Sequence, residues 1–206
     1  MKRRFFAFVI ALVFGSSAQA QVGAWDGYYV GILGSTSNMS VEDLTFGTGA
    51  FEPSGMSYGG FTGMNRQVNS LVYGLEATLE ASNISGNDGA NMAPFSVNTS
   101  VSLRGRLGVD AGRALPYLMA GYVASSFEAD HAGNGSAADI ANFSASGITY
   151  GIGVDLHLNR QNNRFLRLEL QMIDYSDGSM PFYSGSDNHA IASSSQSFSV
   201  GYGISF

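Results

Sequence analysis

The chain has 206 residues, no cysteine and a formal net charge of −6. The lack of cysteine excludes a disulfide framework and a lipoprotein anchor, and the acidic balance argues against direct binding to nucleic acid. Hydrophobic residues make up 45% and charged residues 13% of the chain, which is unusually apolar for a soluble acidic domain.

The N-terminus has the pattern of a secretory signal peptide. Lys2, Arg3 and Arg4 precede an apolar stretch of ten residues over 5–14, and the small-residue site Ala18-Gln19-Ala20 follows. Because a membrane-spanning helix needs about 20 apolar residues, ten are too few to span. We therefore expect residues 1–20 to be a signal peptide that is cleaved before Gln21, and residues 21–206 to form one domain.

The rest of the chain contains eight segments in which apolar and polar residues alternate, the pattern of half-apolar β-strands. The expected strands cover 25–34, 56–64, 71–81, 97–109, 115–127, 148–158, 166–172 and 197–206. The fifth segment is apolar on both faces at its start, so its direction stays open. Most segments have about ten residues, the length that a tilted membrane strand requires.

The most regular of these segments is the last. Phe198, Val200, Tyr202, Ile204 and Phe206 occupy every even position, and every odd position holds Ser or Gly. Since side chains of a strand point alternately to its two faces, this segment has one apolar face and one small polar face. That pattern is typical of a strand with lipid on one side and a barrel lumen on the other.

Charged residues of the middle segments share the polar face, where Gly, Ser and Thr separate them. This face carries Glu76, Glu80, Arg104, Arg106, Asp155, Arg167 and Glu169. Four acids and three bases nearly balance, as a closed interior requires, because a buried charge without a partner costs several kcal/mol. We expect the strand order to bring Glu76 and Glu80 near Arg104 and Arg106, and Asp155 near Arg167.

The alternative is a soluble eight-stranded barrel with an apolar interior and its charges in water. The small residues between the charges favour a polar interior instead. Nine glycines are expected to make room there for the long Arg and Glu side chains: Gly31, Gly59, Gly63, Gly74, Gly108, Gly151, Gly153, Gly201 and Gly203.

Short and long connections alternate along the chain. Links of about five residues are expected at 65–69, 110–114 and 159–163, and the other connections have roughly 15 to 21 residues. Arginines lie in or beside the short links: Arg66, Arg113, Arg160 and Arg164. The charged residues of the long connections are all acids: Glu42, Asp43, Glu52, Asp88, Glu128, Asp130, Asp139, Asp177 and Asp187. This layout predicts an all-β, eight-stranded antiparallel transmembrane β-barrel with short periplasmic turns.

Motifs along the chain resemble, in order, those of the alphaproteobacterial porin-like outer-membrane β-barrel family. They start with Trp25-Asp26-Gly27-Tyr28-Tyr29-Val30-Gly31, which is similar to a W-x-G-x-Y-x-G opening. The others are the G-G-x-x-G segment at 59–67 (with Met64 for a usual Tyr), Y-G-L-E at 73–76, R-G-R-x-G at 104–108, P-Y at 116–117 and G-x-G-V-D at 151–155 (with Asp155 for a usual Glu).

The resemblance implies an eight-stranded barrel in the outer membrane of a Gram-negative cell. The family includes immunogenic envelope proteins and hemin-binding surface proteins. It also implies that the barrel-assembly machinery recognises the C-terminal strand through Tyr202, Ile204 and Phe206. The expected role is structural and surface-directed, with lipopolysaccharide and outer-membrane lipid as partners and no wide channel, because eight strands enclose a filled bore.

Capture of a ligand, or adhesion to a host surface, through the long loops is the alternative function. His131, His189, Tyr183 and Met180 are residue types that ligate heme iron. His131 could also hold a metal with Asp130 and Asp139, although no standard metal-ligand spacing is present. A small pore or a lipid-modifying enzyme ranks lower. No His-x-Ser pair, which could supply a nucleophile and its base, occurs on one strand face, so we expect neither an enzyme nor a cofactor.

Overall fold

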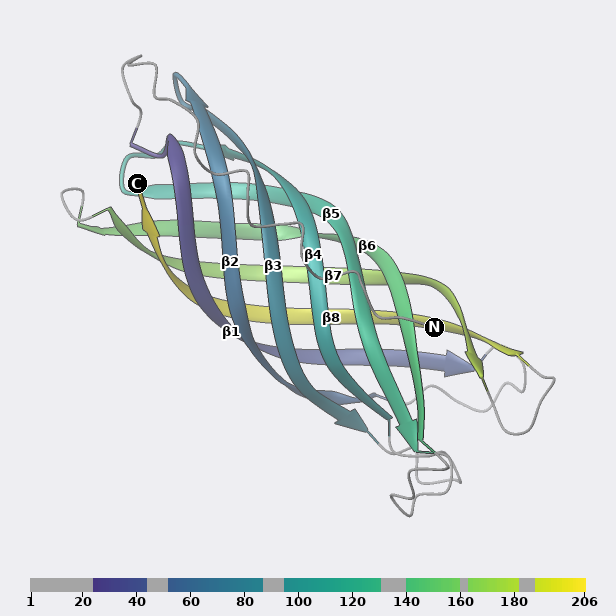
Figure 1. Cartoon of the computed structure of the whole chain (residues 1–206). Coiled ribbons are helices and arrows are strands. Elements are labelled where there is room, and N and C mark those ends of the chain that lie inside the picture. Colours follow the sequence, from purple (N-terminus) through teal and green to yellow (C-terminus); the bar gives the residue numbers. More distant parts are fainter. Residues whose placement is uncertain (1–23, 44–51, 87–94, 131–139, 160–162, 182–187) are drawn as a thin grey trace, which may run out of the picture.

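The computed structural model of the chain describes residues 24–43, 52–86, 95–130, 140–159, 163–181 and 188–206. These residues form eight antiparallel strands that close into one barrel (Figure 1). The strands are β1 (Gly27–Asp43), β2 (Ser54–Val68), β3 (Leu71–Gly86), β4 (Phe95–Val109), β5 (Ala114–Asp130), β6 (Ile140–Asn159), β7 (Arg164–Pro181) and β8 (Asn188–Ser205). The predicted fold class is confirmed, and signal-peptide residues 1–20 lie outside the described part. The described residues contain no helix that is long and apolar enough to cross a membrane.

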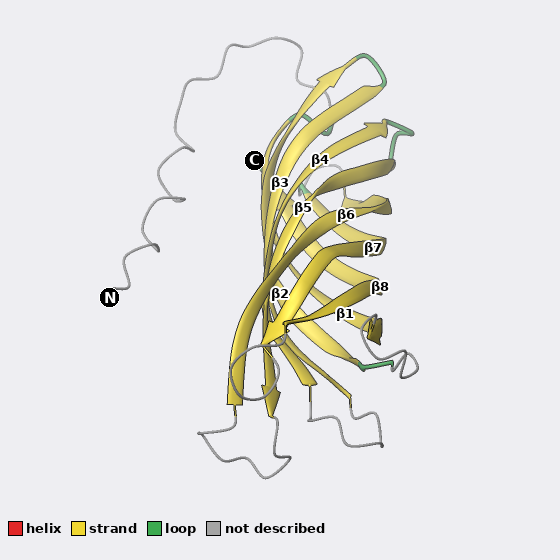
Figure 2. Cartoon of the chain, turned by 90° about the vertical axis from the view of Figure 1, so that its right-hand side faces the viewer, coloured by secondary structure: helices red, strands yellow, loops and turns green. Residues whose placement is uncertain are grey.

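Each strand pairs with its neighbours in the sequence, and β1 pairs with β8 to close the sheet. The short connections after β2 and β4 gather at one end of the barrel, which we call the turn end (Figure 2); the opposite end is the loop end. Asn69 in the first of these turns has φ = 56°, and Gly112 in the second has φ = 82°. Asn and Gly tolerate this left-handed backbone, which a tight hairpin turn requires.

The strands continue farther toward the loop end than the apolar pattern predicted. They have 15 to 20 residues, and the gaps between them at the loop end narrow to 44–53, 87–94, 131–139 and 182–187. Acids placed in loops therefore lie on strands: Glu42, Asp43, Glu128, Asp130 and Asp177. The prediction was wrong because a strand that extends beyond the hydrocarbon layer needs no apolar face, only backbone pairing.

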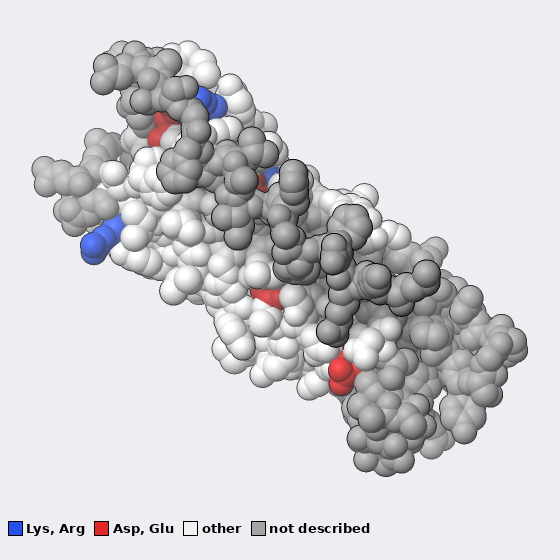
Figure 3. Space-filling model, in the orientation of Figure 1, with Lys and Arg blue, Asp and Glu red and all other residues white. Residues whose placement is uncertain are grey.

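The outer surface of the barrel carries the apolar face of every strand. Its exposed side chains include Ile32, Tyr58, Leu75, Leu103, Leu118, Ile152, Leu170 and Phe198. In the view of Figure 3 the described surface between the two ends is largely uncharged. Such a belt is stable in lipid and would aggregate in water.

The structure also shows which side chains of β5 face the lumen, which the sequence left open, and corrects the face of Val97 in β4. In β5, Leu115, Tyr117 and Met119 are buried in the lumen, whereas Leu118 and Tyr122 are exposed. Val97 was expected on the apolar outer face but is only 3% exposed, inside the barrel. The reason is a register shift in β4 between Val97 and Thr99, because one extra residue in a strand reverses the faces beyond it.

Candidate functional site

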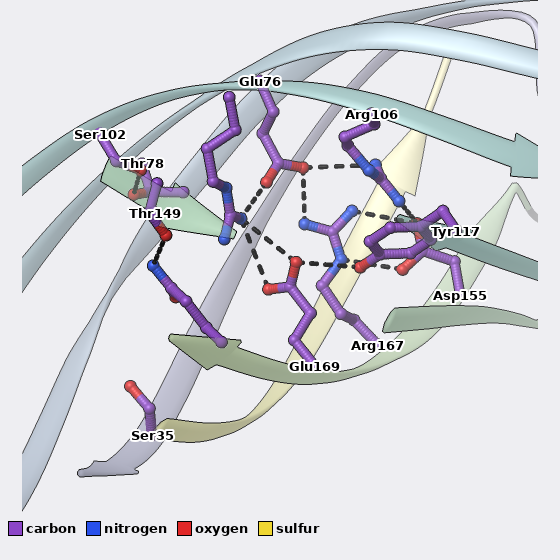
Figure 4. Close-up of polar contacts among 12 residues, drawn as sticks. Ser35, Glu76, Thr78, Ser102, Arg106, Tyr117, Thr149, Asp155, Arg167 and Glu169 are labelled. Carbon is purple, nitrogen blue, oxygen red and sulfur yellow. Dashed lines mark hydrogen bonds and ion pairs between the residues drawn. The ribbon is translucent and has the colours of Figure 1, made fainter. Parts of the chain in front are cut away.

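The lumen contains a buried network of ionised side chains, which we call the lumen plug: Glu76, Arg104, Arg106, Asp155, Arg167 and Glu169 (Figure 4). Strands β3, β4, β6 and β7 supply them. Two pairs lie directly opposite each other in the ladder, Glu76 with Arg104 and Asp155 with Arg167. Six of the seven residues that the sequence placed in an interior ion cluster therefore meet in the structure.

Glu76 is the centre of the plug. Its carboxylate accepts hydrogen bonds from Arg104, from Arg167 Nη1 at 2.6 Å and from Arg106 Nη1 at 3.3 Å. The Tyr29 hydroxyl from β1 donates a further bond of 2.9 Å to the same carboxylate. Glu76 thus joins strands from opposite walls of the barrel.

Asp155 forms the second centre, toward the turn end. Arg167 binds it with two atoms, Nε to Oδ1 at 2.8 Å and Nη2 to Oδ2 at 3.0 Å. Arg106 Nη2 donates to the same Oδ2 at 2.7 Å. Bidentate, charge-assisted bonds of this kind are geometrically specific, so Asp155 holds both guanidinium groups in place.

The third carboxylate completes the charge balance. Glu169 lies 3.3 Å from Arg104 and accepts a 3.0 Å bond from the Tyr117 hydroxyl. Three carboxylates now face three guanidinium groups, all 5% exposed or less. Because desolvation of each ion costs several kcal/mol, only such mutual pairing makes the plug tolerable, and removal of one partner leaves a buried charge uncompensated.

Glu80 is the seventh predicted member, and the structure places it elsewhere. It lies across from Ser100 rather than from an arginine, because the Glu80 position is four residues farther along β3 than Glu76. Its carboxylate accepts hydrogen bonds from Ser35 at 3.0 Å and from Ser57 at 3.2 Å. The expected contact between Glu80 and Arg104 or Arg106 was therefore wrong.

Aromatic rings pack around the plug, and sequence reasoning missed them. Arg106 Cζ lies 3.7 Å from the centre of the Tyr117 ring, and Arg167 Cζ lies 4.0 Å from that of Phe61. Such cation–π contacts stabilise desolvated guanidinium groups further. The sequence does contain an indication of this packing. Phe61 lies on the same face of β2 as Gly59 and Gly63, so that face has space for a large ring.

Four of the nine lumen glycines leave space for these aromatic rings: Gly31, Gly63, Gly153 and Gly203. A Cβ on Gly153 would overlap the Tyr117 ring, and one on Gly203 would overlap the Phe165 ring. Gly59 and Gly201 do lie against long charged side chains, as the sequence suggested: the Cγ of Glu80 and the Cβ of Arg167. Rings take this space at the other positions because a flat ring that crosses a narrow bore needs a bare backbone opposite.

We predict that Gly153→Ala destabilises the barrel by about 1–3 kcal/mol, the usual cost of overpacking, because the new methyl group displaces Tyr117. Gly105→Ala is the matched control. Its Cβ would meet only the Ala120 carbonyl, at 3.7 Å, and should change stability by less than about 0.5 kcal/mol. Urea unfolding in lipid vesicles measures both; equal midpoints for the two variants would contradict the prediction.

Trp25 closes the turn end of the lumen. Its ring stacks on His157, with centroids 3.7 Å apart, and its Nε1 donates to Asp110 Oδ1 at 3.2 Å. Gln67 Nε2 donates to the other Asp110 oxygen at 2.8 Å. Trp25 and Gln67 belong to the first two motifs that the sequence analysis identified. Leu115, beside the P-Y motif at 116–117, and Phe165 belong to the same apolar cluster as Trp25.

A second apolar cluster narrows the lumen toward the loop end. It contains Met39, Ile84, Val97, Val123, Phe127 and Tyr175.

The residues suggested as hemin ligands are only partly described by the structure. His131 and Tyr183 fall outside the described residues, and the backbone of His189 lies in β8 opposite Met180, not in a loop as expected. Within the described ranges, no group of three or more His, Asp or Glu side chains is arranged to hold a metal ion.

Comparison with known proteins agrees with this architecture. Residues 6–206 match the family model of the outer membrane protein beta-barrel domain. The chain belongs to this family. A relative, the 22 kDa outer membrane protein of Rhizobium leguminosarum bv. viciae, is 30% identical over 188 residues, which cover 89% of this chain and 79% of that protein. The protein is therefore an outer-membrane β-barrel of a Gram-negative envelope, and the relative is alphaproteobacterial, as the motifs indicated.

Solved structures show the same fold as this outer-membrane β-barrel. Neisserial surface protein A (NspA) superposes with a TM-score of 0.56 at 17% identity, covering 88% of this chain and 98% of that chain. OprG from Pseudomonas aeruginosa gives a TM-score of 0.50 at 12% identity, covering 89% and 98%. At these identities the likeness concerns the fold alone.

Proposed function

We propose that this outer-membrane β-barrel has a structural role in envelope integrity and a surface-interaction role, without a wide channel. The observation that carries the proposal is the filled lumen: Trp25 caps the turn end, the lumen plug crosses the middle, and the apolar cluster follows toward the loop end. An eight-stranded barrel filled in this way leaves lipid-facing wall and surface loops as its means of action.

The outer surface supports lipid as the main partner. Exposed Leu, Ile, Val, Phe and Tyr side chains form the belt, and the arginines Arg66, Arg113 and Arg164 lie at or beside the turn end. In outer-membrane barrels the short turns face the periplasm, which puts these cations at the inner surface of the membrane. Lipopolysaccharide in the outer leaflet and the barrel-assembly machinery are further proposed partners.

Deletion of the gene in the native bacterium tests this function. We expect cells without the protein to become more sensitive to detergent and to leak periplasmic enzymes, while uptake of small solutes is unchanged. Wild-type protein supplied from a plasmid should restore the barrier. An intact barrier in the deletion strain would contradict the structural role.

The same strain distinguishes the alternative of ligand capture. Growth with hemin as the sole iron source should be unaffected by the deletion. If growth on hemin is lost while the barrier stays intact, the loops act in ligand capture instead. Complementation with a His131→Ala, His189→Ala double variant would then show whether these two residues bind the hemin.

A further inference from the structure

Of the four acids on the polar face of the strands, Glu80 is the one that has no basic partner in the described structure. Glu76, Asp155 and Glu169 each lie within ion-pair distance of an arginine, whereas Glu80 contacts only the hydroxyls of Ser35 and Ser57. Glu80 is half-buried in the lumen, and an ionised carboxylate there is stabilised by an opposite charge nearby. The lumen plug is already neutral, so it has no positive charge to spare for Glu80.

The hydrogen atoms around Glu80 are also too few for the contacts present. The Ser35 and Ser57 Oγ atoms lie 2.8 Å apart, and they lie 3.0 and 3.2 Å from Glu80 Oε2. Each hydroxyl has one proton and an ionised carboxylate has none, so two protons serve three close contacts between oxygens. At most two of the three contacts are then hydrogen bonds, and the third pair of oxygens can share a cation that touches both.

A cavity of about 30 Å³ adjoins this triangle. Glu80 and Ser57 line it together with Ser37, Thr78, Ser100 and Ser102. A site for one water needs roughly 10–15 Å³, so the cavity holds about two water-sized species. Met39 and Tyr175 line it as well, on the side of the loop end. The cavity is therefore polar where Glu80 lies and is lined by apolar groups on the side of the loop end.

We propose that Ser35, Ser57 and Glu80 bind a monovalent alkali cation inside the barrel, with a water or a neighbouring hydroxyl completing its coordination. Carboxylate and hydroxyl oxygens are hard ligands that suit such an ion, and one carboxylate balances one positive charge. Calcium sites in proteins usually use several carboxylates, and within the described lumen Glu80 has no second carboxylate beside it. The cation neutralises the loop-end half of the lumen as arginines neutralise the plug.

The test uses the whole barrel refolded in zwitterionic detergent at constant ionic strength, with choline chloride replaced stepwise by sodium or potassium chloride. Emission of the single tryptophan, Trp25, and heat-modifiable gel mobility give the unfolding midpoint. We expect a saturable rise, roughly 3–6 °C at a cation concentration ten times the Kd. Glu80→Gln should abolish the rise, whereas Glu52→Gln, which removes an exposed carboxylate, should retain it.

A Ser35→Ala, Ser57→Ala double variant keeps the carboxylate and removes two of the three oxygens. It should require a higher cation concentration for the same rise, which tests the site even if Glu80→Gln does not fold. Equal midpoints in choline and in both alkali salts would overturn the proposal, as would a rise that persists in Glu80→Gln. Stabilisation by acid without any dependence on the cation would also overturn it, since a proton on Glu80 would then supply the missing hydrogen.

Discussion

Replacement of Arg167 by Met is expected to destabilise the barrel by about 3–5 kcal/mol, because it leaves buried carboxylates without a partner. Arg167 is fully buried and joins the two centres of the lumen plug, with bonds to Glu76 at 2.6 Å and to Asp155 at 2.8 and 3.0 Å. Methionine matches the aliphatic part of the arginine side chain but carries no charge. The three buried carboxylates of the plug would then face only two guanidinium groups.

Urea unfolding in lipid vesicles, followed by Trp25 fluorescence, measures this loss. Arg164→Met is the matched control, because Arg164 starts the same strand but is exposed at the turn end, and it should change stability by less than about 0.5 kcal/mol. A second variant, Arg167→Met with Asp155→Asn, restores charge balance and should recover part of the loss. Equal stability of the Arg167 and Arg164 variants would show that the plug contributes nothing to the fold.

Deletion of Phe206 is expected to lower the amount of folded barrel several-fold, far more than His131→Ala or His189→Ala. Phe206 exchanges two backbone hydrogen bonds with Tyr28, of 2.9 and 3.1 Å, where β8 meets β1 at the seam of the barrel. The residue is 67% exposed and adds an aromatic side chain to the lipid-facing surface. The deletion therefore removes both the last pairing of the seam and a lipid-facing aromatic group.

Refolding of purified protein in detergent and the yield of folded protein in cells separate the loss of backbone pairing from the loss of the aromatic side chain. Phe206→Ala keeps the backbone pairing, so it should refold in detergent almost as well as the wild type. If the assembly machinery recognises Tyr202, Ile204 and Phe206, this variant should still yield much less folded protein in cells. Heat-modifiable mobility of outer-membrane fractions measures the yield. Normal yields of both Phe206 variants in cells would argue against a C-terminal assembly signal.

Strand number, antiparallel order and the identity of the polar face were predictable from the sequence because they depend on local periodicity. Side chains alternate every second residue, so the pattern around Glu76, Arg104 and Arg167 placed these residues on one face before any contact was known. The short turns were also predictable, since Asn and Gly mark the positions where the backbone reverses. Strand ends at the loop end were not, because beyond the lipid layer the apolar alternation that reveals a strand is lost.

The contents of the lumen depend on closure of the sheet, and only the tertiary structure decided them. Tyr29 contacts Glu76 across 47 residues of sequence and Arg167 contacts Glu76 across 91, because a closed barrel folds opposite walls onto one narrow bore. Which acid receives which arginine depends on side-chain length and on the tilt of the strands. Alternation shows the face on which Glu80 lies, but its partners, two serines from β1 and β2, follow from the geometry of the closed bore.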